Sequence, residues 1–378
     1  MSSALSLLEH FAQVPDPRLE RTQLHSLQSI LLIAICGVIC GAENWAAIER
    51  FGHAKQDFFT KIIDLPNGIP SHDTFGRVFA ALNTESFNEA FIAWVQCLTK
   101  ALGTDIVAID GKTMRRTRNA AKGEPAIHLV SAFAHANGVA LGQVAVDSKS
   151  NEITAIPALL QKLVLSGCLV TLDAMGCQKV IAANIVDAGA DYLLSLKGNH
   201  GTAFDEVQQY FAHADATAFT DIAHGHHEDI DAGHGRVECR RVDTVPMDWF
   251  PERMLWRGLQ SAVRVQSERH IGNETSHETR YFLSTLPVAE AQRAAEGVRG
   301  HWAIENQLHW CLDVAFNEDQ QRMRTGDAAA NMALLSKLAL NLLKRETSRK
   351  VGIKIRRLEA GWNDAYLLKV LAAGGGGN

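Results

Sequence analysis

The stretch TDIVAID, residues 104 to 110, marks the point where the chain changes from a helical to a β-strand pattern. Its apolar, β-branched residues end at Asp110, and two further apolar runs follow, at 126–135 and 138–146. Asn137 and Gly138, between those runs, are the residue pair that a two-residue hairpin turn prefers. The segment therefore predicts three successive strands, the last two of which form a hairpin.

The pattern alternates between helix and strand after the hairpin. We expect a helix at about 154–165, a strand ending at Asp173, a helix at about 177–188 and a strand at 191–197, giving the order βββαβαβ. Because a helical crossover joins the first strand to the one ending at Asp173, the two strands can be parallel neighbours.

Asp110 and Asp173 would then lie at neighbouring strand ends, although an Asp-Gly pair after a strand is also common in plain turns. Two adjacent carboxylates repel each other unless one is protonated or a divalent cation lies between them. Oxygen ligands of this kind suit magnesium or manganese.

The rest of the chain is organised around this α/β segment. Apolar spacing predicts helices through the first hundred residues, and β-like runs between 200 and 287 interrupt the α/β pattern, the last two joined at Gly272-Asn273. The His-rich, Gly-rich stretch 224–236 has irregular ligand spacing, which favours a mobile polar loop over a metal site. The predicted divisions are a helical N-terminal domain (1–100), the first part of an α/β core (101–199), an inserted β subdomain (200–287), the final core helices (288–346) and a basic segment with a flexible tail (347–378).

Composition indicates an ordinary soluble protein. The chain has 378 residues, of which 47% are apolar and 21% charged, and its longest apolar run, 30–42, is shorter than the roughly 20 residues of a membrane span. Its start lacks the pattern of a secretory signal, and its seven cysteines form no repeated C-x-x-C pairs. We therefore expect a cytoplasmic protein.

The formal net charge of -5 hides two basic segments. Residues 112–122 carry five basic side chains and no acid, and residues 337–357 carry eight basic side chains and one acid, Glu346. Such segments can follow a phosphate backbone, but a charge run is also typical of a solvated face. IDGKT does not fit a phosphate-binding P-loop, which requires glycine where the chain has Ile106.

A third candidate acid lies in the segment 298–319. A helix there would align Ile304, Leu308, Cys311 and Ala315 on one face and His301, Glu305 and His309 on another. The face with the three polar residues can be a solvated surface, but the flanking Trp302 and Trp310 make a fully solvated face less plausible. The same residues can instead form a zinc site, although the H-E-x-x-H spacing is absent. Asp313, Glu318 and Asp319, further along, are expected to pair with Arg322 and Arg324.

Several long stretches together resemble bacterial insertion-sequence transposases of the DDE type, and most closely the H-repeat-associated transposase family. They are GAENWAAIERFG, GIPSHDTFGRVF, IDGKTMRR, HLVSAF, KSNEITAIP, TLDAMGCQ, DYLLSLKGN, HGRVE, HWAIENQLHWCLDVAFNED and LALNLLK. The resemblance implies an RNase H-like α/β fold with a mixed sheet, in which acids follow the first and fourth strands and a third lies on a later helix. Asp110, Asp173 and Glu305 match that order.

This resemblance also implies a function. It predicts a DNA transposase that cuts the ends of its element and joins 3′ hydroxyls to target DNA, using two divalent ions held by the three acids, with Mg²⁺ as cofactor and Mn²⁺ as a substitute. DNA is the expected partner, bound by a homodimer in the synaptic complex. The DNA-contact candidates are Lys112, Arg115, Arg116, Arg118, Lys197, Arg299 and His301.

The chain departs from related transposases around Glu305. Tyrosine, arginine and lysine of the related pattern are replaced by Val298, His301 and Leu312, so the DNA contacts of that arginine and lysine cannot be carried over. Two other functions fit the same fold: a DNA-binding relative that no longer cuts, and a nuclease that cuts without joining.

Overall fold

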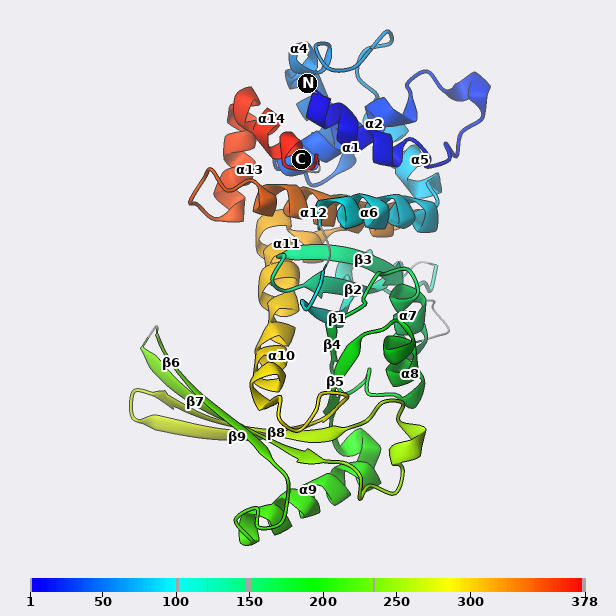
Figure 1. The fold of residues 1–378 in the computed structure, drawn as a ribbon. Helices are drawn as coiled ribbons and strands as arrows, with labels where there is room; N and C mark the ends of the chain where they lie inside the picture. Colours follow the sequence, from blue (N-terminus) through cyan, green and yellow to red (C-terminus); the bar gives the residue numbers. More distant parts are fainter. Residues whose placement is uncertain (1, 100–101, 121, 147–150, 234, 376–378) are drawn as a thin grey trace. The chain divides into compact units, whose positions relative to one another are not determined.

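A computed structural model describes residues 2–99, 102–120, 122–146, 151–233 and 235–375 (Figure 1). The chain forms two compact units. Unit 1 comprises Met1–Ala101, Gly111–Lys149 and Glu305–Asn378, and unit 2 comprises Leu102–Asp110 and Ser150–Ile304. Of the tail predicted to be flexible, residues 376–378 lie outside the described residues, as does His234 of the predicted polar loop.

Unit 2 is built on a mixed sheet with helices packed against it. Strand β1 begins in this unit, and its last three residues belong to unit 1. The elements of unit 2 are β1 (Ile106–Thr113), α7 (Glu152–Leu160), β4 (Leu169–Leu172), α8 (Lys179–Asp187), β5 (Asp191–Leu196), η3 (Gly198–His200), α9 (Gly201–Ala216), β6 (Gly225–Gly233), β7 (Arg236–Pro246), η4 (Arg253–Leu255), β8 (Ser261–Ile271), β9 (Glu274–Ser284) and α10 (Ala291–Ala303).

The strands of the sheet follow the order β3-β2-β1-β4-β5-β9-β8-β7-β6. Strand β4 is parallel to both β1 and β5, and β9 is antiparallel to β5. The element order from β1 to β5 is the predicted βββαβαβ, and the turn between β8 and β9 lies at Gly272, as predicted. The chain therefore has a mixed α/β fold.

Segment 200–287 extends this sheet, since β9 pairs directly with β5. Strands β6 to β9 form an antiparallel ribbon, in which β6 pairs along its whole length with β7 (Figure 1). The prediction of a mobile loop over 224–236 was therefore wrong for residues 225–233. Most side chains of β6 are at least partly exposed, and Ile230 is 69% exposed, so the strand lacks the apolar alternation by which sequence identifies a strand.

Helix α10 packs closely on the parallel strands of unit 2. Figure 1 shows it on one side of β4 and β5, with α7 and α8 on the other. A Cβ atom on Gly297 would lie 2.8 Å from Leu169, and one on Gly300 would lie 2.9 Å from Ile106. Two glycines one turn apart thus allow the helix to approach the strands, and Val298 completes the apolar contact.

Unit 1 is mainly helical and contains one hairpin. Its elements are α1 (Ser2–Phe11), η1 (Glu20–Thr22), α2 (Leu27–Ile39), α3 (Trp45–Ala54), α4 (Gln56–Phe59), α5 (His72–Ala81), α6 (Thr84–Leu98), η2 (Arg115–Thr117), β2 (His128–Ala134), β3 (Val139–Ala145), α11 (Trp310–Phe316), η6 (Glu318–Gln320), α12 (Ala328–Arg345), α13 (Ile353–Trp362) and α14 (Asp364–Ala372). The turn of the β2–β3 hairpin contains Gly138 with φ of +66°, as the Asn-Gly pair predicts.

Helix α12 is the centre of unit 1. Residues 328–343 of this helix are all buried, and it packs against α2, α5, α6 and β3. Helix α2 begins at the cap residue Ser26, whose side chain accepts a hydrogen bond from the Ser29 amide, and nearly all of its residues are buried. The N-terminal helices therefore share one core with the C-terminal helices, and the division predicted at residue 100 does not separate them.

The C-terminal segment predicted to be basic is largely folded ahead of the tail. It contains α13 and α14, which pack against each other and against α12. Residues Tyr366, Leu367, Val370 and Leu371 of α14 are buried, which gives the segment its own apolar contacts with the core of unit 1.

Candidate functional site

Asp110 and Asp173 follow the last paired residues of two adjacent parallel strands. In the register of β1 and β4, Ile109 lies opposite Leu172, and each acid is the next residue along its strand. The predicted parallel pairing of these strands is therefore confirmed. Because both strands run in the same direction, both carboxylates stand at the same end of the sheet in unit 2.

Backbone hydrogen bonds orient the carboxylate of Asp173. Its Oδ1 accepts hydrogen bonds from the amides of Met175 (3.0 Å) and Gly176 (3.1 Å). This turn holds one oxygen toward the backbone. A Cβ atom on Gly176 would lie 2.9 Å from Leu172, so glycine allows the turn to close over the strand end.

His301, near the end of α10, lies with the two acids in unit 2. Its partly buried ring is hydrogen-bonded through Nδ1 to Thr171 Oγ1 of β4, at 3.0 Å. Burial lowers the pKa of His301, while the negative charges of Asp110 and Asp173 oppose that shift. The sequence identified His301 as a candidate DNA contact, but not its attachment to the strand that carries Asp173.

Glu305 belongs to unit 1 and lies in a turn of π-helix, Ile304–His309, between α10 and α11. Its side chain is exposed. The single α-helix expected over this segment is thus interrupted, and the alignment of His301, Glu305 and His309 at α-helical spacing does not apply. Single π-turns inside α-helices are frequent at functional sites, but no periodicity in the sequence signals this one.

No three His, Cys, Asp or Glu side chains in the described part of the chain are grouped so as to hold a metal ion. The zinc alternative therefore finds no support, and a metal site of Asp110, Asp173 and Glu305 stays a prediction. The flanking tryptophans do not bury the segment either, since Trp302 is 47% and Trp310 60% exposed. His301 and His309 of the same segment are partly buried, and His301 bonds to Thr171, so the segment is not one fully solvated face.

Lys112 is held by acids of the segment that follows the π-turn. Its Nζ contacts the carboxylates of Asp313, Glu318 (3.0 Å) and Asp319 (3.8 Å), all within unit 1. Burial alone would lower the pKa of Lys112, but Glu318 and Asp313 raise it above its ordinary value.

The expectation that these acids pair with Arg322 and Arg324 was wrong. Arg324 donates instead to the carbonyl of Arg116. The sequence places Lys112 in the basic cluster at 112–122 and predicts that it contacts DNA. Its side chain instead contacts Asp313, about two hundred residues away along the chain.

Comparison with known proteins decides the family. The model of the family described as "Transposase DDE domain" matches residues 101–342, and that described as "DDE_Tnp_1-associated" matches residues 8–95. The chain belongs to the transposase DDE domain family.

Curated relatives match almost the whole length. "Putative transposase YncI" of Escherichia coli O157:H7 is 40% identical over 98% of this chain and 95% of its own, and "H repeat-associated putative transposase YhhI" of Escherichia coli strain K12 is 38% identical over 98% of each. These names agree with the predicted H-repeat-associated family. A piggyBac transposase synaptic complex with hairpin DNA matches with a TM-score of 0.42 and 9% identity, covering 97% of this chain and 76% of that one.

The basic residues predicted to contact DNA can do so only if their side chains are exposed to solvent. Arg115 and Arg116 of the short helix η2 and the following Arg118 are exposed, while the adjacent Met114 and Thr117 are buried, so the three arginines face solvent. Lys197 is exposed directly after β5 in unit 2. Arg299 is about half exposed and pairs with Asp229 (2.7 Å) and Asp231 (3.1 Å) of β6.

The second basic segment, 337–357, is not a solvated stripe. Lys337 is 2% exposed and donates to Gln143 Oε1 at 2.8 Å. Arg357 is 3% exposed and donates to the carbonyls of Val38 and Ala315, near the ends of α2 and α11. Lys337 and Arg357 thus bond to a buried amide and to carbonyls at helix ends, which is the physical reason that the DNA-binding prediction was wrong for them.

Arg349 and Arg356 of the same segment are also engaged within unit 1. Arg349 pairs with Glu359 at 2.6 Å, and Arg356 donates to the carbonyls of Leu343, Glu346 and Arg349. Charge counts along a sequence do not distinguish such cations from exposed ones.

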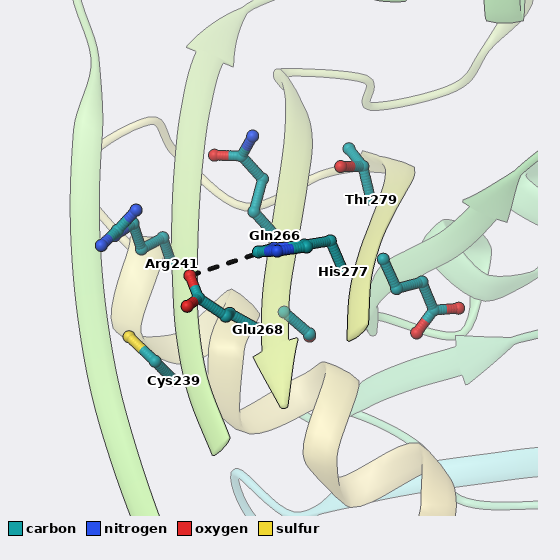
Figure 2. A pocket seen from close by; sticks show the side chains of 8 residues that line it. Cys239, Arg241, Gln266, Glu268, His277 and Thr279 are labelled. Carbon is teal, nitrogen blue, oxygen red and sulfur yellow. Dashed lines mark ion pairs between the residues drawn. The ribbon is translucent and has the colours of Figure 1, made fainter. Parts of the chain in front are cut away.

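Unit 2 also has a small pocket on the β7–β9 ribbon, of about 110 Å³ (Figure 2). Cys239, Glu268 and His277 lie opposite one another across the three strands in its lining, and His277 Nδ1 lies 3.9 Å from Glu268 Oε2. The pocket contains none of the predicted catalytic acids. No helix in the described part of the chain is long and apolar enough to cross a membrane.

Proposed function

We propose that the protein is the transposase of an insertion sequence, which cuts the ends of its element and joins the 3′ hydroxyls to target DNA. The observation that carries the proposal is the position of Asp110 and Asp173 directly after the paired residues Ile109 and Leu172 of adjacent parallel strands, in a chain of the DDE family. This arrangement fits the RNase H-like core that the sequence predicts.

The donor set suits hard divalent cations. Asp110 and Asp173 offer carboxylate oxygens, and the turn at Met175 and Gly176 fixes Asp173 through one oxygen, so that the other can face a cation. Mg²⁺ is commonly held by one or two carboxylates and completes its shell with water and substrate phosphates. We propose Asp110, Asp173 and Glu305 as the ligands, with Mn²⁺ able to replace Mg²⁺.

The reaction divides between the bound cations and the chain. Divalent ions would supply the charge neutralisation that the attacking and leaving oxygens need. The three acids would hold them, and the Met175 and Gly176 amides keep Asp173 in its orientation. Arg115, Arg116, Arg118 and Lys197 bind the DNA backbone, and His301 and Arg299 complete the candidate contacts. Two protomers pairing two element ends would act as a homodimer, in the cytoplasm.

The test is a cleavage and strand-transfer assay on the DNA that flanks the protein's own gene. We expect Mg²⁺-dependent nicks that expose 3′ hydroxyls, joining of those ends to a target, loss of both in EDTA and recovery on adding Mg²⁺ or Mn²⁺. Asp110→Asn and Asp173→Asn should abolish both steps and leave DNA binding intact. Asp187→Asn, which removes an exposed acid of α8, is the matched control and should retain activity.

The outcomes separate the alternatives. Cleavage without joining would identify a nuclease with this fold, and DNA binding without any cleavage by the unmodified protein would identify a relative that has lost catalysis. Either result overturns the proposed strand transfer.

A further inference from the structure

Unit 1 contains an open cavity of about 450 Å³ at the C-terminal end of α12. Its lining combines the tip of the β2–β3 hairpin, the π-turn that carries Glu305, and the end of α12 with the residues that follow. The lining residues are Asn137, Gly138, Gln307, Lys344, Arg345 and Thr347. This volume is within the range typical of ligand sites.

Lys344 is held in this cavity by two contacts. Its Nζ lies over the Phe133 ring, 4.7 Å from the centroid, and 3.5 Å from Gln307 Oε1. Burial lowers the pKa of Lys344 to about 8, partly opposed by Cys311. An anion near the ammonium group would offset the cost of burying its charge.

Arg345, the neighbouring residue, is also fixed. Its Nε donates to the Ala373 carbonyl at 3.2 Å, which uses one of the five N–H groups of the guanidinium. The other residues of the lining contribute amides, a hydroxyl and a glycine, and none of the six is acidic. A cavity that offers two cations and several polar groups, without a carboxylate, is chemically suited to a phosphate.

Two comparisons within the protein set this cavity apart. The pocket shown in Figure 2 has Glu268 and Glu278 in its lining, which disfavour an anion. Within the basic segment 337–357, the side chains of Lys337 and Arg357 are buried and donate hydrogen bonds to other groups of the protein. Lys344 and Arg345, in contrast, both line a cavity that is open to solvent.

We infer that this cavity binds a phosphate of the DNA backbone through Lys344 and Arg345. The inference rests on the proposed function, which it deepens by adding a DNA contact that lies outside the basic cluster after β1. Gln307 belongs to the same π-turn as Glu305, so a phosphate bound here lies beside the element that carries the third proposed acid. The cavity thereby positions the DNA strand along that element.

The first measurement is the salt dependence of binding to an element-end duplex. A lost phosphate contact makes the log–log slope shallower by about 0.9. We expect that change for Lys344→Gln and a slope near that of the unmodified protein for Lys344→Arg. The matched control, Lys350→Gln, removes an exposed lysine of the same segment that is absent from the lining and should leave affinity nearly unchanged. Thermal unfolding checks that each variant is folded.

The second measurement uses the unmodified protein and therefore does not depend on how the variants fold. An amine-acylating reagent at about pH 8 labels Lys344, since a pKa near 8 leaves much of it unprotonated, and peptide mass spectrometry follows the labelling. Element-end duplex should protect Lys344, and should protect Lys350 less. Inorganic phosphate at millimolar concentration, tested separately, distinguishes a site for free phosphate from one for DNA.

The results decide between the two proposals. If the unmodified protein binds no DNA, the proposed function fails and this inference fails with it. If it binds DNA, but Lys344→Gln retains the full slope and DNA gives no protection, only this inference is overturned. Protection by inorganic phosphate without protection by DNA overturns the assignment to a DNA phosphate, and protection by both supports it.

Discussion

Lys112 Nζ lies 3.0 Å from Glu318 Oε2, and both side chains are largely withdrawn from solvent, at 14% and 3% exposure. Lys112 stands two residues after Asp110 on β1, and Glu318 follows the end of α11. Asp313 and Asp319 contact the same ammonium group, and Lys337 supplies a second positive charge beside Glu318. In unit 1, a buried ion pair thus fixes the end of the strand that carries Asp110. The role of Lys112 is therefore structural, and its charge is engaged by acids of the protein instead of DNA.

Breaking this pair should be costly. Lys112→Met retains the apolar stem but leaves Glu318 with less positive charge around it, and removing one partner of a buried pair costs about 3–5 kcal/mol of unfolding free energy. Asp319→Asn is the control, because Asp319 is 40% exposed and 3.8 Å away, and it should change the unfolding free energy by less than about 1 kcal/mol. Urea denaturation of both variants measures this, and equal effects would show that Glu318 is not the principal partner.

Stability should also depend on pH through Glu318. Burial alone would raise the pKa of Glu318, but Lys337 and Lys112 lower it below its ordinary value of 4.5. Because the folded pKa is depressed, the unfolded chain binds the proton more tightly. The stabilisation is therefore present above about pH 4.5 and is lost as the pH falls through the folded pKa.

Glu318→Gln removes this titration. The difference in unfolding free energy between the unmodified protein and Glu318→Gln should therefore shrink as the pH falls below about 4.5, in a denaturation series at fixed ionic strength. A difference that stays constant with pH would exclude Glu318 as the titrating group.

The exposed arginines in and directly after η2 are expected to bind DNA. Replacing Arg115, Arg116 and Arg118 by alanine should weaken binding and reduce the log–log salt slope, by about 0.9 for each phosphate contact removed. The three side chains point to solvent, so the fold should be unaffected. Arg257→Ala removes an exposed arginine of unit 2 as a control. An unchanged slope and affinity in the triple variant would mean that the cluster is only a solvated surface.

The sequence predicted the parts of the fold that local patterns encode. The order from β1 to β5 followed from apolar runs and turn residues, and the pairing of β1 with β4 followed from the crossover rule. Asp110 and Asp173 were therefore correctly expected at adjacent strand ends, because strand direction alone determines where those ends lie.

Other features depended on contacts between distant residues. The Lys112–Glu318 pair joins residues 206 positions apart, and the burial of Lys337 and Arg357 depends on acids and carbonyls that no local pattern identifies. The π-turn at Glu305 changes the helical period at one place, which a search for one constant period cannot detect. Strand β6 was not predicted because its side chains are mostly polar and exposed, so its sequence lacks the apolar alternation of a half-buried strand.

The N-terminal segment should not be removable. The sequence analysis treats residues 1–100 as a separate helical domain. Helix α2, however, is almost fully buried and packs on α12, so deletion of residues 1–100 would expose the apolar face of α12. We expect the truncated protein to be insoluble or to lose cooperative unfolding. A soluble truncation with a sharp thermal transition would restore the separate domain and allow its DNA selectivity to be tested.

Glu305, rather than Asp313, is expected to be the third metal ligand. Asp313 lies eight residues further along and contacts Lys112, while burial raises its pKa against the opposing effect of that lysine. Its charge is thus already engaged in a structural ion pair. Glu305 is exposed in the π-turn, where its carboxylate is accessible to a cation and to DNA.

The test compares Glu305→Gln with Asp313→Asn, two substitutions that keep the side-chain shape and remove its charge. Glu305→Gln should abolish Mg²⁺-dependent cleavage and leave both DNA affinity and thermal stability nearly unchanged, because an exposed glutamate contributes little to folding. Asp313→Asn should lower stability by about 1–3 kcal/mol, through the weakened contact with Lys112, and retain measurable cleavage. The opposite pattern, with cleavage lost only in Asp313→Asn at a temperature where that variant is fully folded, would assign the third ligand to α11 and leave Glu305 as a surface residue.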